Sequence, residues 1–481
     1  MQSFNYMLIA PELFLLGMIC VVMLADLFIV QSPHRRFTYL LTQLTLLGTL
    51  ILTLSLYSYS DTISFYGLFI HDQVSMLLKA TLCVTSMLVF AFARDYLVAH
   101  DIPAGEFYLL GLFSILGMLV AVSAHHFLSL YLGLELMSLP IYAMVALYRD
   151  SAKATEAAIK YFVLGALSSG MLLYGLSMLY GATHSLDMTV VAQAISTMPE
   201  QQSLVLVLGL VFVIAGIAFK LAAVPFHMWV PDVYEGAPVA ATLFITVAPK
   251  IAAFGITYRL LIDAMPGLHV QWQDLLIILA VLSMVIGNVA AIVQTNIRRM
   301  LAYSTIAHGG YMILGFCAGT PDGFAASMYY AMVYGVMSIA GFGMLTMLSG
   351  RGIEVKEIED LRGLNTRNPW LALVMLISLF SMAGIPPTVG FFAKLGVLQA
   401  LVYAPVNLIW LACLAIVLAV IGSYYYLRVV KVMYFDEPEI ATPIRTSMTS
   451  RISISITGLA ILLLGILPSS VINLVHVAVM G

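Results

Sequence analysis

The chain has 481 residues, of which 62% are hydrophobic and only 9% are charged. Soluble domains carry about 25% charged residues, so this composition excludes a soluble, a disordered and a fibrous protein. The formal net charge of −3 gives no basic surface for nucleic acid, which leaves a polytopic membrane protein.

Apolar runs of about 20 residues, the length that crosses a bilayer as a helix, recur along the whole chain. They predict an all-α polytopic membrane protein of about fourteen transmembrane helices in a single bundle. The first run has no basic residues before it and no small-residue cleavage site after it, so we expect a spanning helix rather than a removed signal peptide. The expected helices cover residues 8–30, 37–59, 73–93, 106–124, 127–147, 155–180, 202–228, 239–262, 273–295, 299–319, 323–349, 369–400, 406–434 and 452–474.

The basic residues are distributed unevenly between the two sides of this bundle. Of the 21 Lys and Arg residues, fifteen fall in odd-numbered connections between helices and only Arg259 falls in an even-numbered one. Cytoplasmic connections carry an excess of Lys and Arg, so fourteen helices place both termini outside the cytoplasm. The fifteen are Arg35, Arg36, Arg94, Arg149, Lys153, Arg298, Arg299, Arg351, Lys356, Arg362, Arg367, Arg428, Lys431, Arg445 and Arg451.

The remaining five basic residues are all lysines inside predicted helices: Lys79, Lys160, Lys220, Lys250 and Lys394. A charge at bilayer depth costs about 2.5–3.5 kcal/mol or more, so it indicates a functional site. Buried lysine loses its proton readily, whereas arginine stays charged. The pattern therefore indicates groups that carry protons.

Two of these lysines lie beside prolines that interrupt their helices. Pro225 follows Lys220 in AFKLAAVPFHMWVPDVYEGAP, and Pro386 and Pro387 precede Lys394 in SMAGIPPTVGFFAK. Proline removes a backbone donor and breaks a helix. Paired interrupted segments in the two halves of a chain indicate a transport site.

Other ionisable groups in the predicted helices are candidates for proton relay. Lys250 has no charged neighbour in sequence, so its partner must come from another helix. Glu135 is either a charge relay or a hydrogen-bonded carboxyl group. His227, expected at the membrane edge, and His308 are relay candidates because histidine titrates near neutral pH. The alternatives are an interfacial hydrogen-bonding group for His227 and a core residue for His308.

Groups nearer the helix ends are expected to reach the interface. Lys160 either carries protons or extends to water, and it can pair with Glu156 four residues earlier. For Lys79, Glu12 and Asp26 we expect side chains that snorkel to the membrane surface.

Ligand motifs for cofactors are missing from the sequence. Cys20, Cys83, Cys317 and Cys413 stand singly, and there is no C-x-x-C pair. Neither G-x-G-x-x-G nor G-x-x-x-x-G-K-[ST] occurs. We therefore expect no metal, Fe–S cluster or nucleotide in this chain, and any redox chemistry in other chains.

Nearly the whole chain resembles the antiporter-like membrane subunits of complex I, the proton-translocating NADH:quinone oxidoreductase. In chain order the resemblance rests on GLELMSLP, EAAIKY, FKLAAVPFHMWVPDVYEGAP, GNVAAIVQTNIRRMLAYSTIAHGGY and AGIPPTVGFFAK. It implies three helices within 1–105, inverted repeats at 106–262 (helices 4–8) and 273–434 (helices 9–13), and a last helix at 452–474. Helices 7 and 12 are the broken ones in this family. Its proton-translocating residues map onto Glu135, Lys220, Lys250 and Lys394, with Lys160, His227 and His308 as relay groups.

The resemblance also implies an activity and partners. The chain would be a non-redox subunit of a translocase that exports protons as NADH is oxidised and quinone reduced elsewhere. FMN, Fe–S clusters and quinone would bind partner subunits, including the peripheral redox arm. Other antiporter-like and small membrane subunits would adjoin it in the bacterial inner membrane. A stand-alone cation/proton antiporter remains an alternative, as does a scaffold whose lysines only fix helix pairing.

Overall fold

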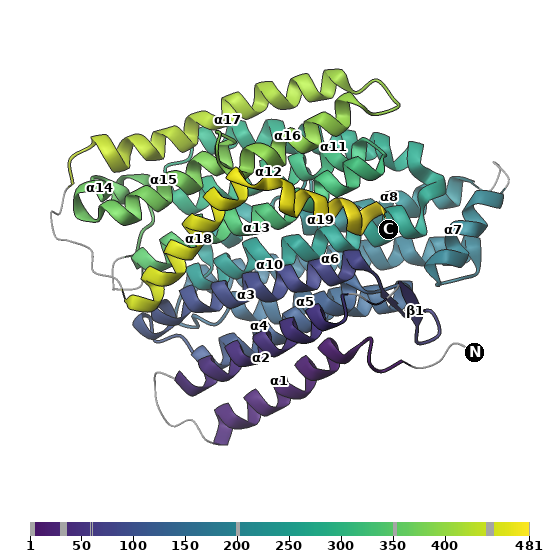
Figure 1. Ribbon diagram of the computed structural model, residues 1–481, viewed down its shortest axis with the longest axis horizontal. Coiled ribbons are helices and arrows are strands. Elements are labelled where there is room, and N and C mark those ends of the chain that lie inside the picture. The colour runs from purple at the N-terminus through teal and green to yellow at the C-terminus, as the bar shows by residue number, and fades with distance from the viewer. Residues whose placement is uncertain are drawn as a thin grey trace.

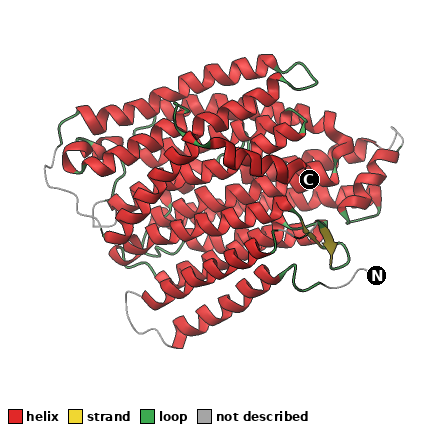
Figure 2. Cartoon of the chain, viewed as in Figure 1, coloured by secondary structure: helices red, strands yellow, loops and turns green. Residues whose placement is uncertain are grey.

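The computed structural model describes residues 5–28, 36–57, 59, 61–198, 203–349, 354–438 and 447–480. Arg35, Arg351 and Arg445, used above for orientation, lie outside these ranges. The described residues form one helical bundle, with a single antiparallel hairpin of strands β1 (Thr62–Ser64) and β2 (Phe69–His71) at one end (Figures 1 and 2). The helices are α1 (Ala10–Phe28), α2 (Arg36–Ser55), α3 (Gln73–Ala99), α4 (Ala104–Val122), α5 (Phe127–Val145), α6 (Ala152–Thr183), α7 (Met188–Thr197), α8 (Ser203–Leu221), α9 (Trp229–Gly236), α10 (Val239–Tyr258), α11 (His269–Ile292), α12 (Ile297–Cys317), α13 (Pro321–Ser349), α14 (Leu364–Arg367), α15 (Pro369–Ala383), α16 (Val389–Val402), α17 (Ile409–Phe435), α18 (Met448–Ile466) and α19 (Pro468–Met480).

Twelve of the described helical segments are long and apolar enough to cross a bilayer. The two other predicted spans are α12 and the interrupted pair α15 and α16, so the architecture of about fourteen spans with breaks in helices 7 and 12 is confirmed. Helix 7 is longer than predicted. Its span does not end at residue 228, because α9 continues it to Gly236 after the break.

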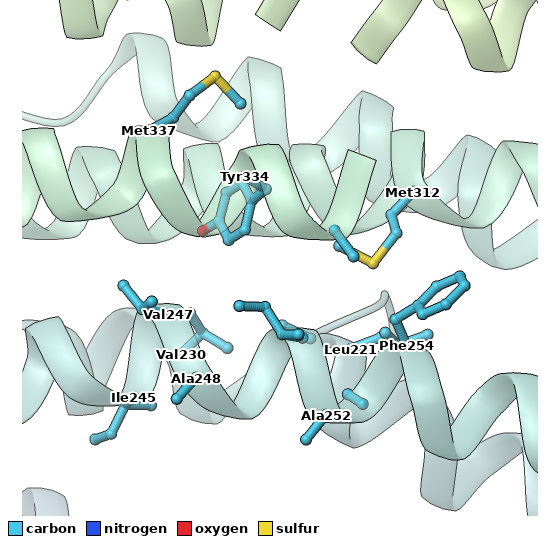
Figure 3. Close-up of a cluster of buried hydrophobic side chains, with 14 of the residues drawn as sticks. Leu221, Val230, Ile245, Val247, Ala248, Ala252, Phe254, Met312, Tyr334 and Met337 are labelled. Carbon is cyan, nitrogen blue, oxygen red and sulfur yellow. The ribbon is translucent and has the colours of Figure 1, made fainter. Parts of the chain in front are cut away.

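The centre of the bundle is formed by α10 and α13 (Figure 1). Every residue of α10 is buried. Its sequence, VAATLFITVAPKIAAFGITY, is apolar on all faces, which is typical of a helix without a solvent-facing side. Figure 3 shows the apolar layer here, with Leu221 and Phe254 lying across from Met312 and Tyr334. A lysine at position 250 is therefore surrounded by core.

The two predicted repeats share a backbone brace. In the first repeat, residues 125–127 ahead of α5 pair with residues 186–188 ahead of α7; in the second, residues 295–297 ahead of α12 pair with residues 356–358. Each brace has two backbone hydrogen bonds of 2.9–3.1 Å. The elements that follow them, α7 and α14, lie at opposite ends of the bundle (Figure 1). The same local structure thus occurs once at each end, as inverted repeats require.

Candidate functional site

The break in helix 7 leaves carbonyl groups that side chains then bind. After α8 the chain turns through Ala222, whose φ is +63°. A helix end exposes carbonyls without intrahelical donors. Here the Phe219 carbonyl accepts a hydrogen bond from the Trp229 indole at 3.2 Å, and the Lys220 carbonyl accepts one from the Lys250 ammonium at 3.0 Å. The partner of Lys250 thus comes from another helix, as predicted.

Helix α12 of the second repeat packs directly against this break. A Cβ added at Gly309 would lie 2.7 Å from the Leu221 carbonyl oxygen. Only glycine permits this approach, because no other residue lacks a Cβ atom. His308, the adjacent residue in α12, is thereby placed next to the first repeat.

The Lys220 side chain reaches α5. Its ammonium donates a 2.7 Å hydrogen bond to the Ser138 hydroxyl. Glu135 lies one turn earlier on the same face of α5. Its Oε1 is buried, and no described Lys or Arg nitrogen lies within 4.0 Å of its carboxylate. The structure therefore places the expected acid beside Lys220 without a direct ion pair.

Lys220 and Lys250 line one small cavity. Its volume is about 10 Å³, and Ser138, Tyr161 and Trp229 contribute to its wall. A cavity needs about 10–15 Å³ to hold one water. The cavity at the break is therefore at the lower limit of the size that holds one water, and both lysines line it.

The second break is arranged in a similar way. Helix α15 ends at Ala383 and is capped by Gly384, whose φ is +87°. The Lys394 ammonium donates to the carbonyls of Met382 at 3.1 Å and Ala383 at 2.9 Å, and it lies 5.0 Å from the centroid of the Tyr311 ring. The C-terminal end of a helix carries partial negative charge that stabilises a cation. Each break thus binds one lysine through helix-end carbonyls.

His308 is buried between two phenols. Its Nδ1 lies 2.7 Å from the Tyr330 hydroxyl and its Nε2 lies 3.1 Å from the Tyr426 hydroxyl. The Tyr426 hydroxyl is in turn 2.5 Å from that of Ser304. A neutral imidazole has one donor and one acceptor nitrogen, so this chain of groups can pass a proton within the second repeat.

Two predicted relay residues are not among those that line the cavity between Lys220 and Lys250. His227 occupies the turn between α8 and α9. Lys160 pairs with Glu156 at 2.9 Å, as predicted, and also with Asp232 at 2.9 Å. The Lys160 side chain is 43% exposed, so it belongs to the rim of the bundle.

The structure corrects the interpretation of Lys79 and Glu12. They form a 2.6 Å ion pair with side chains 0% and 8% exposed, so neither snorkels to the surface. The β-hairpin supplies the reason, since the Phe69 ring lies 4.8 Å from the Lys79 ammonium and covers it. Asp26 also has a partner, because the Thr38 hydroxyl donates to it at 2.7 Å.

Arg259, which the count of basic residues placed in a connection between helices, is 1% exposed. Its guanidinium binds both carboxylate oxygens of Asp72 at 2.7 and 2.8 Å and one of Asp263 at 2.8 Å. It also donates to the Val122 carbonyl at 2.9 Å. Burial raises the pKa of Asp72, but the Arg259 charge outweighs it and the pKa lies below its usual range. In the sequence, only the four-residue spacing between Arg259 and Asp263 indicates this cluster.

The described residues contain no group of three or more His, Cys, Asp and Glu side chains that could hold a metal ion. The fold, the two breaks and their lysines define an antiporter-like membrane subunit. A family model described as NADH:quinone oxidoreductase/Mrp antiporter, TM, matches residues 124–460. The chain belongs to this family.

Individual relatives agree with the family model. The chain is 53% identical to NADH-quinone oxidoreductase subunit N of Coxiella burnetii, over 98% of both chains. Among solved structures it is similar to a chain of respiratory complex I from Thermus thermophilus with bound aureothin, with a TM-score of 0.81, 31% identity and coverage of 96% of this chain and 98% of that one. It also shares the fold of a chain in the Mrp complex from Dietzia sp., with a TM-score of 0.86, 20% identity and coverage of 98% and 96%.

Proposed function

We propose that this chain is the proton channel formed by an N-type membrane subunit of NADH-quinone oxidoreductase. The observation that carries the proposal is the first break, where Lys250 binds the Lys220 carbonyl and both side chains line one small cavity. Two lysines that line one cavity can exchange a proton through it. The relatives named subunit N support the complex.

Glu135 acts as the switch in this proposal. Bound to Lys220, its carboxylate stabilises the protonated ammonium. When the carboxylate is not bound to Lys220, as in this structure, the Lys220 ammonium donates to the neutral Ser138 hydroxyl instead. In that state the proton moves to Lys250. Moving one charge against 100 mV costs about 2.3 kcal/mol. One hydrogen bond to a charged group contributes roughly 1.5–3 kcal/mol, so gaining or losing one such bond to Lys220 is comparable in energy to this work.

The remaining site residues extend this path. Lys394 is the terminal group, reached through His308 and its tyrosines. Lys160 and His227 serve proton access to the first repeat. The repeats are residues 106–262 and 273–434, within one integral membrane domain.

The chain itself carries no redox step in this proposal. FMN, Fe–S clusters and quinone bind partner subunits, and the complex as a whole is the translocase. The chain lies in the bacterial inner membrane with both termini on the outer side, which follows from the excess of basic residues on the opposite side.

Substitution of Lys220 tests the channel. In inverted membrane vesicles that contain the assembled complex, Lys220→Ala should abolish most proton uptake driven by NADH. Lys153→Ala, an exposed lysine, is the matched control and should pump normally. Full pumping by Lys220→Ala would contradict the channel, and cation-for-proton exchange by the chain without partners would favour a stand-alone antiporter.

A further inference from the structure

A second charged cluster lies outside the lysine path, on α9. Asp232 accepts hydrogen bonds from the Lys160 ammonium of α6 at 2.9 Å and from the Arg299 guanidinium of α12 at 3.0 Å. Arg299 also binds Glu235, one turn further along α9, at 3.2 Å. Since α6 and α12 belong to different repeats, the Asp232 carboxylate links the two halves of the chain.

The first residue of α9, Trp229, lines the same small cavity as the two lysines of the first break. The Trp229 indole donates to the Phe219 carbonyl, next to Lys220, and the Lys250 ammonium lies 5.3 Å from a Trp229 ring centroid. Tyr161 of α6 stacks on Trp229 at a centroid distance of 4.5 Å. Because α9 has only eight residues, any shift of Asp232 also moves the indole against both lysines.

We propose that Asp232 is a positioning residue for proton transfer. Its two ion pairs hold α9 in the register that keeps Trp229 against the first break. Arg299 lies in the first turn of α12, nine residues before His308, so the same link connects the charge state of the second repeat to the lysines of the first. This inference rests on the proposed channel function.

The cluster lies at the rim of the bundle rather than in its core. The side chains of Lys160, Asp232 and Arg299 are 43%, 35% and 30% exposed, and a depression of about 150 Å³ lined by Lys160 and Asp232 opens beside them. Isolated exposed ion pairs contribute little, but several charges that share one partner form a network. Salt screens such a network because its charges are partly exposed. In this proposal these partly exposed charges position α9, whose first residue, Trp229, is buried.

Asp232→Asn tests the link because it removes the charge and keeps the size. In vesicles with the assembled complex, we expect the rate of NADH-driven proton pumping to fall about three- to tenfold. Asp232→Glu should restore most of the rate, since a carboxylate can still bind both cations. Glu235→Gln is the matched control: it removes one contact to Arg299 but leaves Asp232 bound to both Lys160 and Arg299, and its rate should stay within about twofold of the unmodified complex.

A double-mutant cycle distinguishes positioning from general stability. Asp232→Asn combined with Arg299→Gln should pump no more slowly than Asp232→Asn alone, because both open the same bridge. Independent, additive losses would overturn the proposal, as would equal rates for Asp232→Asn and Glu235→Gln.

Two further outcomes keep the test decisive. If Asp232→Asn does not assemble on a blue-native gel, Arg299→Gln opens the bridge from α12, and pumping by that variant equal to Glu235→Gln would overturn the proposal. Full pumping by Lys220→Ala would instead overturn the channel function itself, so the two failures are distinguishable.

Discussion

Lys250 donates a 3.0 Å hydrogen bond from its ammonium to the backbone carbonyl of Lys220. The two lysines are therefore joined through a helix end rather than through an acid. This carbonyl is free because α8 stops at Leu221, and helix C-terminal carbonyls stabilise a cation. The break in helix 7 thus positions Lys250 as well as Lys220.

Replacing Lys250 with arginine separates charge from proton release. Lys250→Arg keeps a cation near the Lys220 carbonyl, but arginine does not deprotonate in proteins. We expect proton uptake per NADH in inverted vesicles to fall at least about tenfold, a loss typical of removing a proton-transfer group. Lys431→Arg, at a side chain 64% exposed, is the control. Normal pumping by Lys250→Arg would exclude Lys250 as a proton carrier.

Ser138 should matter through its bond to Lys220. Ser138→Ala removes the acceptor at 2.7 Å, and a hydrogen bond to a charged group contributes about 1.5–3 kcal/mol. We expect pumping to slow about tenfold in assembled complex, measured by dye quenching in vesicles. Ser168→Ala, at a buried serine with only a 3.4 Å bond to the Gly216 carbonyl, should change little. Equal rates for the two variants would contradict this role.

The buried pair of Lys79 and Glu12 is expected to stabilise the fold without carrying protons. Lys79→Met leaves the Glu12 carboxylate buried and unpaired, which costs about 3–5 kcal/mol. The assembled complex should therefore dissociate at lower temperature on blue-native gels. Adding Glu12→Leu should recover most of this loss, since an apolar pair can replace a buried ion pair. If the recovered double variant failed to pump, Lys79 would belong to the proton path.

The Arg259 cluster predicts acid sensitivity. The pKa of Asp72 lies below its usual value of 3.8, so the carboxylate stabilises the folded state above pH 3.8. That contribution is lost as the pH falls through the folded-state pKa. The thermal unfolding midpoint of the solubilised protein should therefore begin to drop as the pH falls below 3.8. Asp72→Asn should lower the midpoint at neutral pH and flatten its decrease in acid; an unchanged slope would contradict the assignment.

Local signals in the sequence predicted the helices and both breaks. Proline acts on its own helix, so Pro225 and Pro386 could be interpreted without knowing the fold. Partners distant in sequence could not be predicted. Ser138 is 82 residues from Lys220, and Asp72 is 187 residues from Arg259; no periodicity encodes which helices pack together.

Burial was also hard to predict for single charged residues. Lys160 and Lys79 both stand in apolar helices, yet one lies at the rim and the other under the β-hairpin. A short hairpin between helices decides the second case. That contact depends on tertiary packing rather than on helix composition.

The braces at residues 125–127 and 295–297 consist of backbone amide and carbonyl groups. Such groups neither gain nor lose protons in the physiological range. One brace closes at each end of the bundle, and each therefore forms equally well in an acidic or an alkaline compartment. The framework is therefore indifferent to the pH difference across the membrane against which the proposed channel would move protons.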